Sequence, residues 1–137
     1  MPSLFTPTEQ AVLRLSALTP PLPREREPDL SSILWQDIID VAERGKLLPA
    51  LGWKLNETRT DDAVAQSYLQ CCPDDARSTL NTEYRYAWVF AERRKIMMRQ
   101  FRRILRDNQI SFVLHKGLGY LTSLYPNDAI RIMNDVD

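Results

Sequence analysis

The feature that most constrains this chain is the stretch from residue 73 to residue 106, which contains no glycine and, after Pro73, no proline. Pro73, Asp74 and Asp75 suit the first turn of a helix. Apolar residues then recur three or four positions apart, with one gap, as on one helix face: Leu80, Tyr84, Trp88, Ala91, Met98, Phe101 and Leu105. The pattern predicts one helix about 50 Å long, with Tyr84, Trp88 and Phe101 in the core and Asn108 as a left-handed stop.

Four shorter helices are predicted before it. Thr6-Pro7-Thr8-Glu9 is a capping box that opens the first, with Val12, Leu15 and Leu18 as its apolar stripe. Ser31 or Ser32 is expected to cap the second, which carries Leu34 and Ile38 and ends at Gly45. The third begins near Pro49, and the fourth runs from the Thr60-Asp61-Asp62 start signal to about Cys71. Residues 20–28, with four prolines, are expected to form an extended loop.

Composition excludes some classes of protein. The 137 residues include 18 basic and 18 acidic side chains, so attraction of the whole chain to nucleic acid or membrane is not expected. No apolar run is long enough for a transmembrane helix, and nothing resembles a secretory signal. Cys71 and Cys72 are adjacent, which disfavours a disulfide bond between them. We expect them to form a partly buried helix end. We therefore expect a reduced, cytoplasmic protein.

After residue 108 the hydrophobic residues no longer follow the spacing of a helix. Residues 110–115 are β-branched or aromatic at most positions and predict a strand. A turn over Lys116-Gly117-Leu118-Gly119 leads into a short helix, and residues 130–137 predict a second strand. The predicted fold class is α+β, with an α-rich N-terminal region over 1–107 and a strand–turn–helix–strand unit over 108–137.

Two acidic residues in the second predicted strand suggest a metal site. Asp135 and Asp137 are two positions apart, so their side chains would leave the same face of a strand. Hard carboxylate oxygens at that spacing suit Mg²⁺. Arg131 would share this face and either bind phosphate or pair with Asp135 to orient it. Lys116 and Gly117, between a strand and a helix, suit phosphate binding through a point charge, free N–H groups and close backbone approach.

These residues resemble the bacterial uncharacterised nucleotidyltransferase family, a divergent branch of the DNA polymerase beta-like nucleotidyltransferase superfamily. The specific motifs are Phe112-Val113-Leu114-His115-Lys116-Gly117, Leu124-Tyr125-Pro126 and Arg131-Ile132-Met133-Asn134-Asp135-Val136-Asp137. The helical segment from Trp35 to Leu55 and the long helix also resemble the family's N-terminal region.

The resemblance implies a nucleotidyltransferase core with a mixed sheet, to which residues 108–137 contribute the beginning. It implies that an acceptor hydroxyl attacks the α-phosphate of a nucleoside triphosphate, with two Mg²⁺ ions at the catalytic pair Asp135 and Asp137. Lys116 and Gly117 match its phosphate-binding turn. The superfamily uses a third carboxylate on a later strand, so this chain is expected to be truncated and inactive. A strand ending at Asp137 would also expose a sheet edge, and we expect homo-oligomers through it.

A non-catalytic function is the alternative interpretation. The long helix is locally basic and carries few acidic residues. Its basic residues are Arg85, Arg93, Arg94, Lys95, Arg99, Arg102, Arg103 and Arg106. Such a helix can bind nucleic acid or another partner. A solvated face, with arginine stems covering apolar surface, is the favoured reading of the same pattern.

Overall fold

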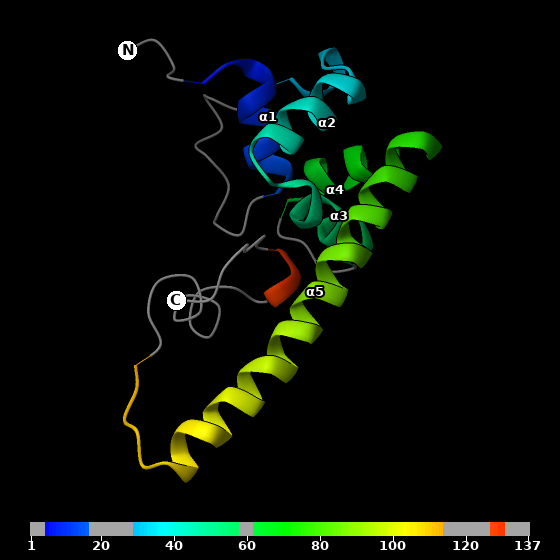
Figure 1. The fold of residues 1–137 in the computed structure, drawn as a ribbon. Helices are drawn as coiled ribbons and strands as arrows, with labels where there is room; N and C mark the ends of the chain where they lie inside the picture. The colour runs from blue at the N-terminus through cyan, green and yellow to red at the C-terminus, as the bar shows by residue number, and fades with distance from the viewer. Residues whose placement is uncertain (1–4, 17–28, 58–61, 114–126, 131–137) are drawn as a thin grey trace.

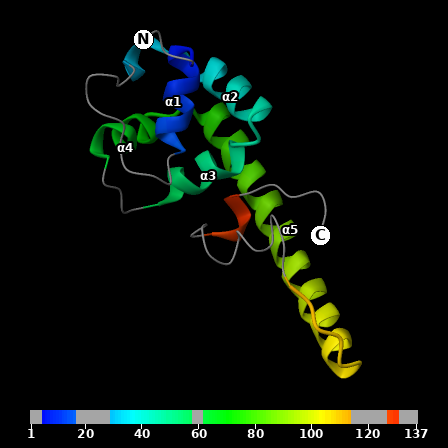
Figure 2. The same ribbon diagram turned by 90° about the vertical axis from the view of Figure 1, so that its left-hand side faces the viewer.

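A single long helix, α5, organises the molecule in the computed structural model (Figure 1). The structure describes residues 5–16, 29–57, 62–113 and 127–130. The helical elements are α1 (Pro7–Leu15), η2 (Leu30–Ser32), α2 (Trp35–Arg44), α3 (Leu48–Asn56), α4 (Ala63–Gln70), α5 (Asp74–Asp107) and η3 (Asp128–Ile130). Helices α1 to α4 gather around the N-terminal half of α5, and its C-terminal half projects beyond them (Figure 2).

The helix predictions are largely confirmed. The Thr6–Glu9 capping box is present, because Glu9 N–H donates to Thr6 Oγ1 at 3.2 Å and Thr6 N–H donates to Glu9 Oε2 at 2.7 Å. Helix α4 begins after Asp62, whose side chain accepts from Ala65 N–H. Helix α5 runs unbroken over 34 residues from Asp74. Each of these signals depends on neighbours in sequence, which is why the sequence alone reveals them.

The start and the end of α2 differ from prediction. Its N-cap is Leu34, which makes no side-chain capping bond and is 69% exposed, whereas Asp29 caps the short helix η2 by accepting from Ser31 N–H. The helix does end at Gly45, but the left-handed residue is Lys46, with φ of 56°. Lys46 N–H donates to the Glu43 carbonyl and Leu47 N–H to the Ala42 carbonyl, as in a Schellman motif.

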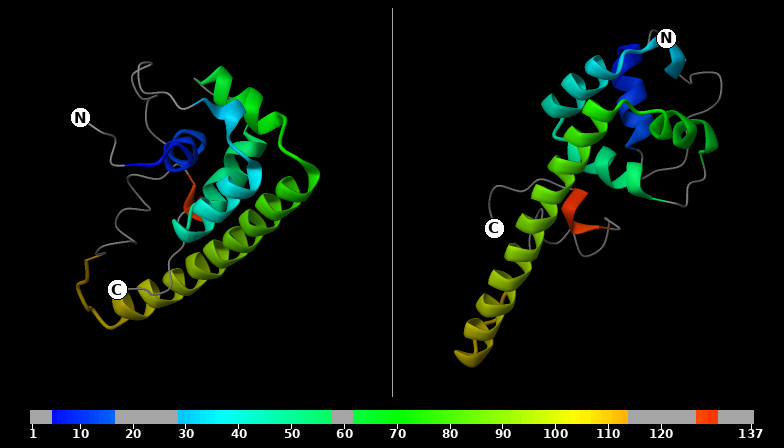
Figure 3. Two further views of the ribbon diagram at one scale, coloured as in Figure 1. Left: turned by 90° about the horizontal axis from the view of Figure 1, so that it is seen from above. Right: turned by 90° about the vertical axis from the view of Figure 1, so that its right-hand side faces the viewer.

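The core lies where α1 to α4 meet the first turns of α5 (Figure 3). Each helix contributes small or aliphatic buried side chains, including Val12, Leu15, Ile38, Ala42, Leu51, Leu69, Ala76 and Leu80. Helix α3 packs closely against the backbone of α5 at Gly52. A Cβ atom there would collide with the Leu80 carbonyl oxygen and lie 2.8 Å from Tyr84 Cβ. Only glycine permits this crossing.

The predicted α+β fold class is wrong for the part of the chain that the structure describes, which is 78% helical and contains no strand. Residues 110–113, assigned to the first strand, have no regular structure, and Val113 is 88% exposed. A strand is stabilised by hydrogen bonds and side-chain pairs with a neighbouring strand, and the described residues offer none. Ile130, assigned to the second strand, is instead the buried last residue of η3.

The rest of the predicted sheet lies outside the described residues, as do the 20–28 loop and the proposed oligomer edge at Asp137. Within the described ranges, no helix combines the length and the apolar character needed to cross a membrane.

Candidate functional site

All five residues of the predicted nucleotidyl-transfer site fall outside the described ranges: Lys116, Gly117, Arg131, Asp135 and Asp137. Their grouping therefore stays a prediction. Among the described residues, no group of three or more His, Cys, Asp or Glu side chains is arranged to hold a metal ion. Of the described residues, Val113 precedes Lys116 in the chain, and residues 127–130 lie between Gly117 and Arg131.

The segment that leads into the predicted carboxylate pair is fixed against α5. Asn127 Nδ2 donates to the Tyr84 hydroxyl at 2.8 Å, and Asn127 Oδ1 accepts from Ala129 N–H at 2.8 Å. Ala129 and Ile130 are buried, at 1% and 3% exposed, where η3 packs on α5 and α3. The hydrogen bond from Asn127 to Tyr84 joins residues 43 positions apart, so no local pattern could reveal it.

A second candidate site lies at the other end of α5. Arg99, Arg102, Arg103 and Arg106 occupy positions i, i+3, i+4 and i+7, which share one helix face. All four side chains are exposed, and together with residues 109–112 they line a hollow of about 770 Å³. We call this surface the arginine hollow.

The end of α5 shapes this hollow. Asn108 ends the helix with φ of −96°, so the left-handed residue is Gln109, at 57°, and not Asn108 as predicted. Gln109 N–H donates to the Arg106 carbonyl at 2.9 Å and Ile110 N–H to the Leu105 carbonyl at 2.8 Å, which completes a Schellman motif. The chain then leaves the helix axis (Figure 1), and Ser111 and Phe112 line the hollow with the arginines.

Little negative charge compensates these arginines. From residue 93 to residue 113 there are seven cationic side chains and one acidic side chain, Asp107. Asp107 lies 3.7 Å from Arg103 and 3.6 Å from Arg106. Because the three side chains are more than half exposed, such pairs contribute little. The basic residues of the predicted helix are exposed, except that Arg94 is half-buried, and four of its arginines share one surface.

Three aromatic residues of α5 that were predicted to lie in the core, two in its first half and one in its second, are exposed or only half-buried. Trp88 is 51% exposed and Phe101 is 50% exposed, and Tyr84 is half-buried. The sequence pattern indicates a helix face correctly but does not indicate how far neighbouring helices cover it. In the described structure, α1 to α4 pack around the first half of α5.

Residues 31–137 match the sequence model of a family described as uncharacterised nucleotidyltransferase. The chain belongs to this family. The matched stretch includes all five predicted site residues, helices α2 to α5 and the arginine hollow. The resemblance noted from the sequence motifs is therefore confirmed at the level of the nucleotidyltransferase family. The chain matches no curated protein and no solved structure.

Proposed function

We propose that this nucleotidyltransferase-family chain takes part in the transfer of a nucleoside monophosphate from a nucleoside triphosphate to an acceptor hydroxyl. The observation that carries the proposal is the family match over residues 31–137, because it includes the two acidic residues and the predicted turn at Gly117. The acceptor oxygen forms a bond to the α-phosphorus, and the bridging bond to the β-phosphate oxygen breaks. Pyrophosphate leaves, and the hydroxyl proton passes to a base.

The acidic residues provide the chemistry that a metal ion needs. Asp135 and Asp137 offer hard carboxylate oxygens, the donor set that suits Mg²⁺. Bound Mg²⁺ would stabilise negative charge on the attacking and leaving oxygens. Lys116 would neutralise a phosphate charge, and Gly117 would let the backbone N–H groups approach it. Arg131 would bind phosphate or orient Asp135.

Calorimetric titration of a non-hydrolysable triphosphate with Mg²⁺ into the full chain tests this proposal. We expect Asp135→Asn and Asp137→Asn each to weaken Mg²⁺-dependent binding at least tenfold. Asp75→Asn is a matched control, because Asp75 is an exposed carboxylate in the first turn of α5. Binding that survives both site substitutions, or that needs no Mg²⁺, would overturn the metal assignment.

A further inference from the structure

We propose that the arginine hollow binds a single-stranded nucleic acid, whose terminal hydroxyl is the acceptor in the transfer reaction. The inference rests on the proposed function for the role of that hydroxyl, but strand binding itself depends only on described residues. Those residues are the four arginines, Gln109, Ser111 and Phe112.

The charge distribution is the first argument. The whole chain is formally neutral, yet its cationic side chains are concentrated toward the C-terminal half of α5. Concentrated positive charge on a partly enclosed surface raises the local concentration of polyanions. The helix dipole stabilises cations only in the last turn, so it accounts for Arg106 but not for Arg99, two turns earlier. A negatively charged partner accounts for both.

The extent of the cluster favours a strand over a single phosphate group. Arg99 and Arg106 are seven residues apart, which corresponds to about 10 Å along the helix axis. In each strand of duplex DNA, phosphates follow each other about every 3.4 Å along the helix axis, and an extended single strand separates them further. The row of four guanidinium groups is therefore longer than a single phosphate group and spans a short run of phosphates.

The remaining lining suits the other parts of a nucleotide. Phe112 is 41% exposed at the hollow, and an accessible aromatic ring can stack on an unpaired base. Gln109 and Ser111 supply an amide and a hydroxyl that can hydrogen-bond to phosphate, sugar or base edges. A base buried in a duplex could not stack on this ring, so these contacts favour a single strand.

The hollow is also close to the predicted transfer site along the chain. Lys116 follows Phe112 by four residues, which can span at most about 14 Å. A strand that extends from the arginines toward Phe112 would therefore run in the direction of the predicted phosphate-binding turn.

Fluorescence anisotropy of labelled 12-nucleotide single strands, RNA and DNA in separate arms, measures the binding directly with the full chain and no triphosphate. We expect Arg99→Gln/Arg102→Gln to weaken binding at least tenfold and to reduce the slope of log K against log[salt] by about 1.4. Arg85→Gln/Arg93→Gln removes the same charge from exposed positions on the same helix that lie outside the hollow. We expect it to change binding less than threefold.

Phe112→Ala tests the stacking contact separately from charge. It should weaken strand binding about tenfold, because stacking on an aromatic ring contributes appreciably for each base, and it should leave the salt slope unchanged. Unchanged helix content by circular dichroism would show that these exposed substitutions leave the fold intact.

Equal losses in the two double variants would overturn the proposal, because they would show a response to net charge alone. Preference for duplex over single strand, or complete displacement by inorganic triphosphate at low concentration, would also overturn it. Mg²⁺-triphosphate binding that persists when strand binding fails would reject the hollow and retain the proposed function. Strand binding with no effect of Asp135→Asn or Asp137→Asn on triphosphate binding would reject the metal site alone.

Discussion

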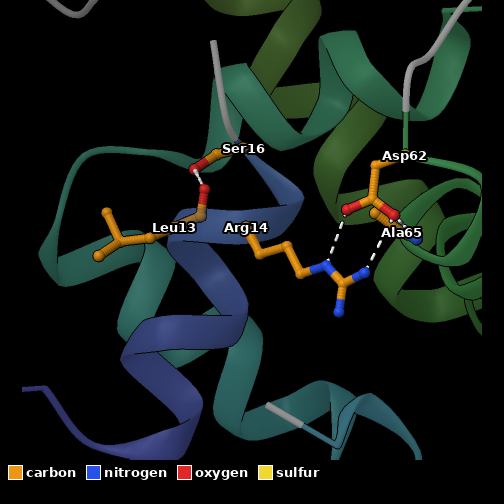
Figure 4. Close-up of polar contacts among 5 residues, drawn as sticks. All are labelled: Leu13, Arg14, Ser16, Asp62 and Ala65. Atoms are coloured by element: carbon orange, nitrogen blue, oxygen red, sulfur yellow. Dashed lines mark hydrogen bonds and ion pairs between the residues drawn. The ribbon is translucent and has the colours of Figure 1, made fainter. Parts of the chain in front are cut away.

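Arg14 and Asp62 form a two-point ion pair that joins α1 to the beginning of α4 (Figure 4). Arg14 Nε donates to Asp62 Oδ2 at 2.8 Å, and Arg14 Nη2 donates to Asp62 Oδ1 at 3.0 Å. Asp62 also caps α4 by accepting from Ala65 N–H at 3.0 Å. The side chains are 6% and 19% exposed, so the pair is largely shielded from water. One carboxylate therefore starts a helix and fixes its position against another.

Asp62→Ala should strongly destabilise the protein. The substitution removes the N-cap and leaves the buried Arg14 guanidinium without this partner, and breaking a buried pair typically costs about 3–5 kcal/mol. The exposed Lys95–Glu92 pair offers a control, because its side chains are 47% and 37% exposed. Glu92→Gln should change the free energy of unfolding by less than about 1 kcal/mol. Urea denaturation of both variants measures the difference, and equal effects would contradict the structural role of the pair.

The Asp62 carboxylate also makes the free energy of unfolding depend on pH in the acidic range. The hydrogen bonds from Arg14 lower the pKa of Asp62 below its ordinary value of 3.8, with a further contribution from Ala65 N–H and against the effect of burial. A lowered folded-state pKa gives stability that is fully present above the unfolded-state pKa. That stability is lost as the pH falls through the folded-state value. Thermal denaturation between pH 6 and pH 2 should therefore show a smaller acid-induced loss in Asp62→Asn than in the unmodified chain.

Gly52→Ala should destabilise the packing of α3 on α5. The new methyl group would collide with the Leu80 backbone, which belongs to a rigid helix and cannot move aside cheaply. Overpacking of this kind costs about 1–3 kcal/mol or more. Gly45→Ala is the matched control, because its Cβ would lie no closer than 3.4 Å to Val41 O and Gly45 has a helical φ of −81°. Similar melting temperatures for the two variants would contradict this assignment.

The two adjacent cysteines should react at different rates. Cys71 is exposed, whereas Cys72 is buried, and burial raises the pKa of its thiol to about 11. Because the thiolate is the reactive form, Cys72 should be modified slowly at pH 7.5. A chromogenic disulfide reagent should show one fast and one slow thiol, and the fast phase should disappear in Cys71→Ser. Loss of the fast phase in Cys72→Ser instead would reverse the assignment.

How much of this structure the sequence predicts depends on the range of the interactions. The capping box at Thr6 and the long run of α5 were predicted correctly, because both depend on residues within a few positions of each other. The strand over 110–113 was predicted wrongly, since a strand needs a partner that local pattern cannot supply. The Arg14–Asp62 pair joins residues 48 positions apart, and nothing near either residue indicates it.

The same distinction between local and long-range interactions decides which parts of the candidate sites the sequence predicts. The basic residues of α5 were evident in the sequence, but their grouping in one hollow depends on the turn at Gln109, whose left-handed backbone the sequence does not indicate. Asp135 and Asp137 were identified from spacing and family resemblance, and they stay a prediction beyond the described residues. The anchor between Asn127 and Tyr84, just before them, had no local signal.

Because α3 contacts the backbone of α5 at Gly52, a small change of angle at that contact moves the far end of α5 by a larger distance. Between Leu80, where α3 crosses, and Arg103, there is about 35 Å of uninterrupted helix. A tilt of about 5° at the crossing would therefore displace the guanidinium end by about 3 Å, roughly the length of one hydrogen bond. The missing side chain at Gly52 thus determines the angle at which α5 crosses α3, and through that angle the position of the arginines several turns away.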